Sequence, residues 1–127
     1  MRFDRFTAKL QQALSDAQSI AVGRDHSSIE TVHLLLALLQ QKDGSVSPLL
    51  KQAGANLANL DKKLNEQLGR VATLKNTTGE VQVGQDLQRV FNLTDKLAQQ
   101  RQDQFIASEL VLLAIMDAGG DTAKSLQ

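Results

Sequence analysis

The chain holds few residues of the kinds that perform chemistry, and their spacing argues against a metal site. Its two histidines, His26 and His33, have no cysteines near them and do not form the H-E-x-x-H spacing of a zinc-binding helix. We therefore expect no metal ion. We expect the His33 imidazole to hydrogen-bond to a neighbouring loop instead.

Nucleotide binding and hydrolysis also lack their usual residues. No stretch approaches the phosphate-binding pattern G-x-x-x-x-G-K-[ST], and the pair Gly119-Gly120 is more typical of a helix end. No G-x-S-x-G turn surrounds any serine, and Ser27-Ser28 is typical of caps and turns. The sequence therefore predicts no catalytic residue and no cofactor, and a hydrolase remains a remote alternative.

Composition limits the partners and the compartment. Lysine plus arginine equals aspartate plus glutamate at 14 each, so no excess positive charge favours nucleic acid. The chain has no cysteine, its charged start is unlike a signal peptide, and no apolar run reaches membrane-spanning length. We expect a cytoplasmic domain that binds neither nucleic acid nor membrane and is monomeric when isolated.

Apolar residues recur every three or four positions and predict an all-α fold. The helix expected over 31–41 has leucines on all sides, so it must be enclosed by other elements. Ser108 is a plausible cap for the helix that Gly119-Gly120 ends. The other helices are expected to end near Gly23 and to cover about 45–53, 57–68 and 85–100, with a short one after Gly120.

An internal repeat organises these helices. Moving the sequence by 77 positions aligns Ile29 with Ile106 and 35–37 with 112–114, where both stretches read Leu-Leu-Ala. We predict one domain over 1–127, with repeat one at about 1–69, a connecting loop at about 70–84 and repeat two at about 85–127. Repeat two has no counterpart of the helix over 57–68, so we interpret the chain as a fragment whose second repeat is incomplete.

Differences between the aligned positions indicate where repeat two has an added role. Repeat two is more apolar at three places, which pair Asp16 with Leu93, Ser28 with Phe105 and His33 with Leu110. We predict a shallow groove beside Leu93 and Leu110, with Asp103 and Glu109 at its rim, that suits an extended apolar peptide. The sequence leaves open the alternative that both leucines pack against the rest of the protein.

Several ordered segments resemble the amino-terminal (Clp N) domain of the ClpB-type protein disaggregases, bacterial members of the Clp AAA+ chaperones. They are MRFDRFT at 1–7, SDAQS at 15–19, GRD at 23–25, HLLLALL at 33–39, GSVSPLL at 44–50, QDL at 85–87, DKLAQ at 95–99 and FIASEL at 105–110. The resemblance covers the whole chain. It implies two pseudo-twofold-related four-helix repeats, the second truncated here.

The resemblance also implies a function in substrate recognition. Such a domain is not itself an enzyme, because ATP binds modules of the parent hexameric ring that this chain lacks, and an Hsp70-type chaperone collaborates with that ring. The domain would bind unfolded or aggregated polypeptide and pass it to the ring. The matching positions in this sequence are the apolar Leu93, Leu97 and Leu110 and the polar Thr7, Asp103 and Glu109.

Two alternatives belong to other classes of function. The domain could be a regulatory or docking cap on its own ring, or it could bind adaptors, as N domains of the ClpC or ClpA type do. ClpC-type domains carry T-E-H-[IL]-L-L at the start of both equivalent helices. Here these starts read Thr31-Val32-His33 and Ser108-Glu109-Leu110, which disfavours a twin acidic pocket.

Overall fold

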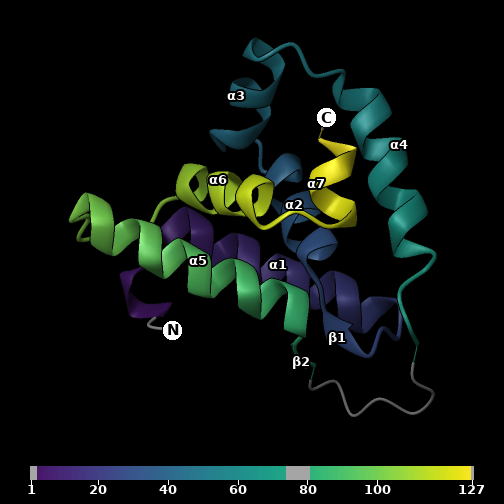
Figure 1. The fold of residues 1–127 in the computed structure, drawn as a ribbon. Helices are drawn as coiled ribbons and strands as arrows, with labels where there is room; N and C mark the ends of the chain where they lie inside the picture. The colour runs from purple at the N-terminus through teal and green to yellow at the C-terminus, as the bar shows by residue number, and fades with distance from the viewer. Residues whose placement is uncertain (1–2, 74–80, 127) are drawn as a thin grey trace.

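The structure is a computed structural model that describes residues 3–73 and 81–126. Helices form most of it, joined by short segments and one pair of two-residue strands (Figure 1). This confirms the all-α class. The elements are a 3-10 turn at Phe3–Arg5, α1 (Ala8–Gly23), β1 (Ser28–Ile29), α2 (Thr31–Gln40), α3 (Val46–Gln52), α4 (Leu57–Leu68), β2 (Gln82–Val83), α5 (Gln85–Arg101), α6 (Ser108–Ala118) and α7 (Asp121–Ser125).

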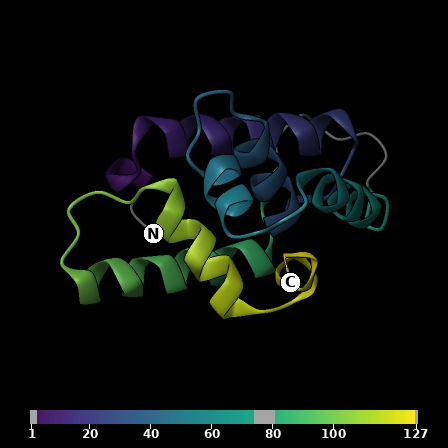
Figure 2. The same cartoon turned by 90° about the horizontal axis from the view of Figure 1, so that it is seen from above.

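Helix α2 lies at the centre of the fold, as its leucines predict. Every residue from Thr31 to Leu38 is buried, and α1, α3, α4, α5 and α6 all contact this helix. Figure 2 shows α1 and α5 along opposite edges with α2 and α6 between them. A helix that is apolar on all faces is stable only in such surroundings, since any exposed face would leave leucine in water.

The outer helix α1 has one apolar stripe and a defined start. Its buried residues are Leu10, Ala13, Ala17 and Ala21, which are three or four positions apart and so share one face. The Thr7 side chain caps the helix by accepting a hydrogen bond from the Leu10 amide at 3.3 Å. Helix α5 repeats this arrangement on the other edge, with Leu87, Val90, Phe91, Thr94 and Ala98 buried.

Two parallel backbone pairings join the two halves of the chain, and the 77-residue offset relates one pairing to the other. Phe6 pairs with Ile106, and the equivalent residues Val83 and Ile29 pair in the β1–β2 ladder. The Thr7 amide donates to the Ile106 carbonyl at 2.9 Å, and the Gly84 amide donates to the Ile29 carbonyl at 2.9 Å. Residues 6–7 of the first half therefore pair beside the turn of the second half, and residues 83–84 pair beside the turn of the first half.

The turns that follow α1 and α5 have the same backbone. Asp25 and Gln102 both take the left-handed conformation, with φ of 57° and 59°, which is uncommon outside glycine. The next amide in each turn closes the helix end, because His26 donates to Ala21 and Asp103 donates to Ala98, both at 2.9 Å. The repeat seen in the sequence is thus a repeat of local geometry.

Helix α4 covers α2 and contacts α7. The Asn56 side chain caps it by accepting from the Asn59 amide at 3.1 Å, and Leu60, Leu64 and Leu68 form its buried stripe. The predicted connecting loop at about 70–84 lies partly outside the described residues. Its described part includes β2 and Thr73, which forms a bridge with His26.

The described residues form neither a membrane-spanning helix nor a cluster of metal ligands. Within the described ranges, no helix has both the length and the apolar character needed to cross a membrane. In the same part of the chain, no three histidine, cysteine, aspartate or glutamate residues lie together as metal ligands would.

Candidate functional site

The turn between α5 and α6 borders a surface hollow of about 360 Å³, which we call the α5–α6 hollow. Its position follows from the end of α5 at Arg101, the left-handed Gln102 and the start of α6 after Ala107. The lining residues are Arg101, Asp103, Phe105, Ala107, Glu109, Leu110 and Leu113. All seven lie within a short stretch of repeat two.

The wall of the α5–α6 hollow is apolar and partly open to water. The Phe105 side chain is 67% exposed and Leu113 is 40% exposed, whereas Leu110 is 7% exposed and forms the floor. Exposing a phenylalanine beside a leucine forgoes hydrophobic stabilisation of about 25 cal/mol for each Å² left in water. Such grouped exposure is typical of a binding surface.

The rim is polar and carries both signs of charge. Asp103 accepts a hydrogen bond from Arg101 Nε at 3.2 Å, so these two charges partly neutralise one another. Glu109 lies in the first turn of α6, is exposed and makes no ion pair with any residue from 3–73 or 81–126. The α6 amino terminus stabilises its negative charge. The hollow therefore offers an apolar centre beside polar groups.

The structure brings three of the six predicted binding residues together in this hollow, namely Asp103, Glu109 and Leu110. Leu93 and Leu97 are half-buried on α5, pack against the core and do not line the hollow. Thr7 serves as the α1 cap, and its amide holds the Ile106 carbonyl beside the same turn. A binding role for these residues stays a prediction.

Sequence reasoning left four lining residues out of the groove: Arg101, Phe105, Ala107 and Leu113. The repeat comparison does single out Phe105, because its counterpart is Ser28. It gives no signal for Leu113, whose counterpart Leu36 is the same residue but is only 2% exposed. Exposure of Leu113 depends on what packs over α6, which a comparison of residue types does not reveal.

In repeat one the equivalent turn is closed by buried polar groups. The Glu30 amide donates to His33 Nδ1 at 2.7 Å, which leaves the proton of a neutral His33 ring on Nε2. That nitrogen lies 2.7 Å from His26 Nδ1, which must then be the acceptor. The Ser27 amide donates to the Ala72 carbonyl at 2.9 Å, so the chain after α4 fastens this turn. The His33 imidazole therefore hydrogen-bonds to His26 and Glu30, which lie in the segment before α2, so the predicted bond to a neighbouring loop is present.

Burial sets the ionisation of this polar cluster. Desolvation, followed by the charge of His26, lowers the pKa of His33 to about 4. Desolvation also lowers the pKa of His26. Glu30 has its pKa raised to about 7, first by burial and then by a hydrogen bond with the Asp86 side chain. Both imidazoles are therefore neutral at pH 7, consistent with the tautomers given above.

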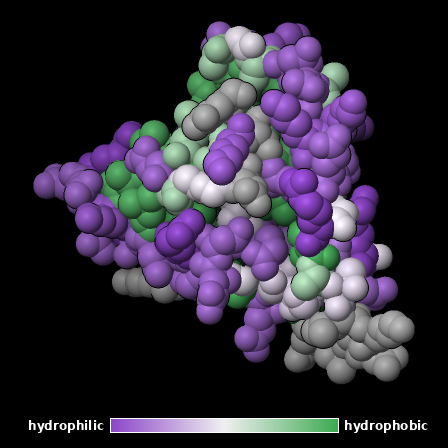
Figure 3. Space-filling model, turned by 45° about the vertical axis from the view of Figure 1, so that its right-hand side comes forward, coloured by the Kyte–Doolittle hydropathy of each residue, from purple (hydrophilic) through white to green (hydrophobic). Residues whose placement is uncertain are grey.

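Other hollows lie elsewhere on the described surface, and two of them are larger than the α5–α6 hollow or border charged groups. One of about 510 Å³ lies between α3, α4 and α6 and includes the exposed Leu49 and Met116; we call it the α3–α6 hollow. Another of about 370 Å³ lies between the repeats, beside Glu30, Asp86 and two arginines. Figure 3 shows hydrophobic side chains in separate patches among hydrophilic ones, so apolar surface is not confined to one place.

Comparison with known proteins assigns the family. Residues 5–127 match the Clp repeat (R) N-terminal domain. The chain belongs to the Clp repeat N-terminal domain family. This confirms the resemblance to the Clp N domain, which is not a catalytic ATPase module. Val32 of this Clp N domain is 4% exposed and carries no charge, so the start of α2 lacks the carboxylate that a twin acidic pocket needs at this position.

Relatives of this Clp N domain include chaperones of the predicted type. The chain is 54% identical over 126 residues to the chaperone protein ClpB of Pseudomonas putida, which covers 99% of this chain and 15% of that protein. The chain thus spans about one seventh of that curated relative. This identity supports the recognised similarity to the amino-terminal domain of ClpB.

Solved structures share the fold at low sequence identity. The Hsp104 N-terminal domain from Candida albicans has a TM-score of 0.78 at 18% identity, covering 96% of this chain and 89% of that one. The N-terminal domain of the ClpV1 ATPase from E. coli has a TM-score of 0.83 at 21% identity, covering 98% and 78%. These likenesses confirm the Clp N fold.

Proposed function

We propose that this Clp N domain is the substrate-recognition module of an ATP-dependent protein disaggregase. It binds exposed apolar segments of unfolded or aggregated protein in the α5–α6 hollow. The observation that carries the proposal is the grouping of exposed Phe105 and Leu113 over buried Leu110, with Asp103 and Glu109 at the rim. The family match and the ClpB relative support it.

The size of the α5–α6 hollow fits transient binding. A volume of about 360 Å³ has room for only one or two side chains of a peptide. A flexible polypeptide also loses conformational freedom when it binds, which opposes the gain from burying its apolar groups. The account therefore expects weak binding with rapid release, which suits a module that passes a segment onward.

The remaining steps involve parts outside this chain. In the proposal a parent hexameric AAA+ ring, which binds ATP, receives the segment and threads it, with an Hsp70-type chaperone as collaborator. Leu93, Leu97 and Thr7 would then contact the stretches of substrate that extend past the hollow. We place this activity in the cytoplasm, where ring and aggregates would meet.

Paired substitutions test the site. Phe105→Ser with Leu113→Ser should lower affinity for a reduced, alkylated and therefore unfolded globular protein by about tenfold, because the apolar wall is lost. The matched control is Leu49→Ser with Met116→Ser, which removes two side chains of similar exposure, 42% and 52%, from the α3–α6 hollow. Circular dichroism confirms folding of both variants. Equal affinity of the first variant and the wild type would refute the proposed site.

A docking role on the domain's own ring is the second candidate. The observation in its favour is the exposed pair Leu49 and Met116, which the proposed function does not use. On this account the isolated domain would not bind unfolded protein. The control variant, and not the Phe105 variant, would then weaken association of the domain with the remainder of its protein.

A further inference from the structure

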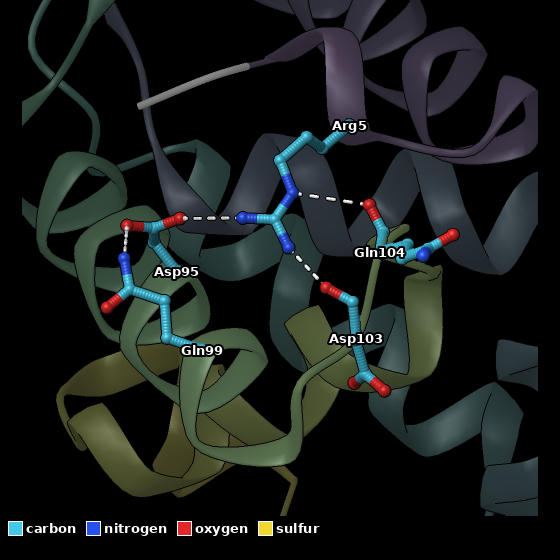
Figure 4. A network of polar contacts seen from close by, with 5 residues as sticks. All are labelled: Arg5, Asp95, Gln99, Asp103 and Gln104. Atoms are coloured by element: carbon cyan, nitrogen blue, oxygen red, sulfur yellow. Dashed lines mark hydrogen bonds and ion pairs between the residues drawn. The ribbon is translucent and has the colours of Figure 1, made fainter.

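Arg5 holds the turn that forms the rim of the α5–α6 hollow. Figure 4 shows its guanidinium between α5 and this turn, with donors directed to both. Nε donates to the Gln104 carbonyl at 3.2 Å, and Nη2 donates to the Asp103 carbonyl. Nη1 lies 3.7 Å from the Asp95 carboxylate, which also accepts from Gln99 at 3.1 Å.

The main chain of the same segment holds the turn as well. The Ile106 amide donates to the Arg5 carbonyl at 2.8 Å, and the Ile106 carbonyl accepts from Thr7 at 2.9 Å. The two carbonyls bound by the guanidinium belong to Asp103 and Gln104, the two residues that precede Phe105, so they constrain the backbone from which Phe105 projects. The side chain of Arg5 is 24% exposed, so solvent only partly competes for these bonds.

Repeat one has the same turn without an arginine. The residue equivalent to Arg5 is Gln82, which is exposed, and the turn there is fastened by Ser27 and Ala72 at 2.9 Å. In repeat one the backbone after α4 therefore holds the turn, whereas in repeat two the Arg5 side chain holds it. Within the described ranges, the guanidinium contact occurs only at the turn that borders the α5–α6 hollow.

We propose that Arg5 is a positioning residue for substrate recognition, which fixes Asp103 and Phe105 in the arrangement that binds an apolar segment. This inference rests on the proposed function of the hollow. Lysine is not a substitute, because one ammonium group lacks the planar set of donors that reaches two carbonyls and a carboxylate together. Without the Arg5 contacts the turn is less ordered before binding. Part of the binding free energy is then spent on ordering it, which lowers affinity.

The test uses the full chain with Arg5→Gln and Arg5→Lys, and Arg24→Gln as a control at an exposed arginine of repeat one. The probe is the same reduced, alkylated globular protein, measured well below each variant's melting temperature. Both Arg5 variants should bind about three- to tenfold more weakly. Their Ile106 and Thr7 amides should exchange hydrogen faster, while the Gly84 amide, which is the counterpart of the Thr7 amide in the other link, is unchanged.

The other outcomes separate the inference from the function on which it rests. If the Arg5 variants bind normally while the double variant Phe105→Ser with Leu113→Ser binds weakly, Arg5 has no positioning role and the proposed function stands. If this double variant also binds normally, the proposed function fails and the inference fails with it. Weaker binding by Arg5→Gln, with normal binding by Arg5→Lys and unchanged exchange at Ile106, would show that Arg5 acts through its charge, which contradicts positioning.

Discussion

The turns after α1 and α5 share one backbone and differ in what fills them. In repeat one, His26 and His33 contact one another at 2.7 Å inside the protein. In repeat two, Asp103 and Leu110 occupy these positions and border a hollow open to water. A duplicated turn can thus be closed by buried polar groups or left open for a ligand, and a few side chains decide which.

At the two places where the repeats meet, the larger and the smaller residue of the contact are exchanged. Gly84 lies against Glu30, whose carboxyl group would clash with a Cβ placed on that glycine. The positions equivalent to these two are Thr7 and Ala107, where the larger and the smaller residue are exchanged. Pseudo-symmetry therefore preserves the backbone while each contact is packed in its own way.

The largest effect on stability is expected from giving repeat two the histidine of repeat one. Leu110→His replaces a leucine that is only 7% exposed by a polar imidazole, so it removes apolar packing and buries a polar ring. We expect a loss of about 3 kcal/mol in the free energy of unfolding, measured with urea. Leu113→His, at an exposed position of the same helix, is the control and should cost less than about 0.5 kcal/mol.

A second prediction concerns the contact between Gly84 and Glu30. Gly84→Ala should displace the Glu30 carboxyl from Ser28 and Asp86, at a cost of about 1 kcal/mol. Gly23→Ala, where nothing lies within 4 Å of the added Cβ, should be neutral or stabilising. In a Glu30→Ala background the Gly84 change should lose its cost, so additive effects in this double-mutant cycle would contradict the contact.

A third prediction is that Glu30 and His33 have opposite effects on pH dependence. Glu30, with its pKa raised from 4.5 to about 7, stabilises the folded state fully below pH 4.5, and this contribution is lost as pH rises from 4.5 to about 7. His33, with its pKa lowered from 6.5 to about 4, costs stability as pH falls from 6.5 to 4, because only the unfolded chain takes the proton. Between pH 4.5 and 6.5 the two effects oppose each other.

Glu30→Gln removes the stabilisation that protonation of Glu30 gives to the folded state as pH falls. The variant should lose more stability than the wild type when urea midpoints are compared at pH 7.5 and pH 5.5. The control is Glu66→Gln, an exposed change on α4 that should follow the wild type. Parallel loss in Glu30→Gln and the wild type would contradict a raised pKa at Glu30.

The smallest effect is expected at the rim of the α5–α6 hollow. Arg101→Gln removes a 3.2 Å ion pair with Asp103, but the Arg101 side chain is 60% exposed and water replaces its contacts. The free energy of unfolding should change by less than about 0.5 kcal/mol. A loss above 1 kcal/mol would mean that this pair, and not the Arg5 contact, holds the turn.

Helix positions followed from sequence because apolar spacing fixes which face is buried. The enclosed α2 and the bounds of α4 at Leu57–Leu68 needed only local residues. The cap of α6 was wrong, since Ala107 is the cap position and Ser108 is its first helical residue, buried in the core. A serine before an apolar run suggests a cap, but the parallel link at Ile106 sets where this helix starts.

The candidate site was predicted only in part for a similar reason. Leu110 was found by comparing aligned residue types, which reports differences in polarity, and Asp103 was placed at the rim of the groove predicted from that comparison. That comparison does not show that Arg5 reaches a turn almost a hundred residues away, nor that Leu113 is open while its identical counterpart is covered. Such contacts depend on the tertiary arrangement of α5, α6 and the amino-terminal segment.

The most direct measurement is an amide NMR titration of this chain with the reduced, alkylated globular protein. The account predicts that shifts concentrate at 101–113, around Asp103, Phe105 and Glu109, and leave the equivalent turn at 24–36 unchanged. Shifts concentrated instead at the α3–α6 hollow, around Leu49 and Met116, or no shifts at any residue, would contradict recognition through the α5–α6 hollow.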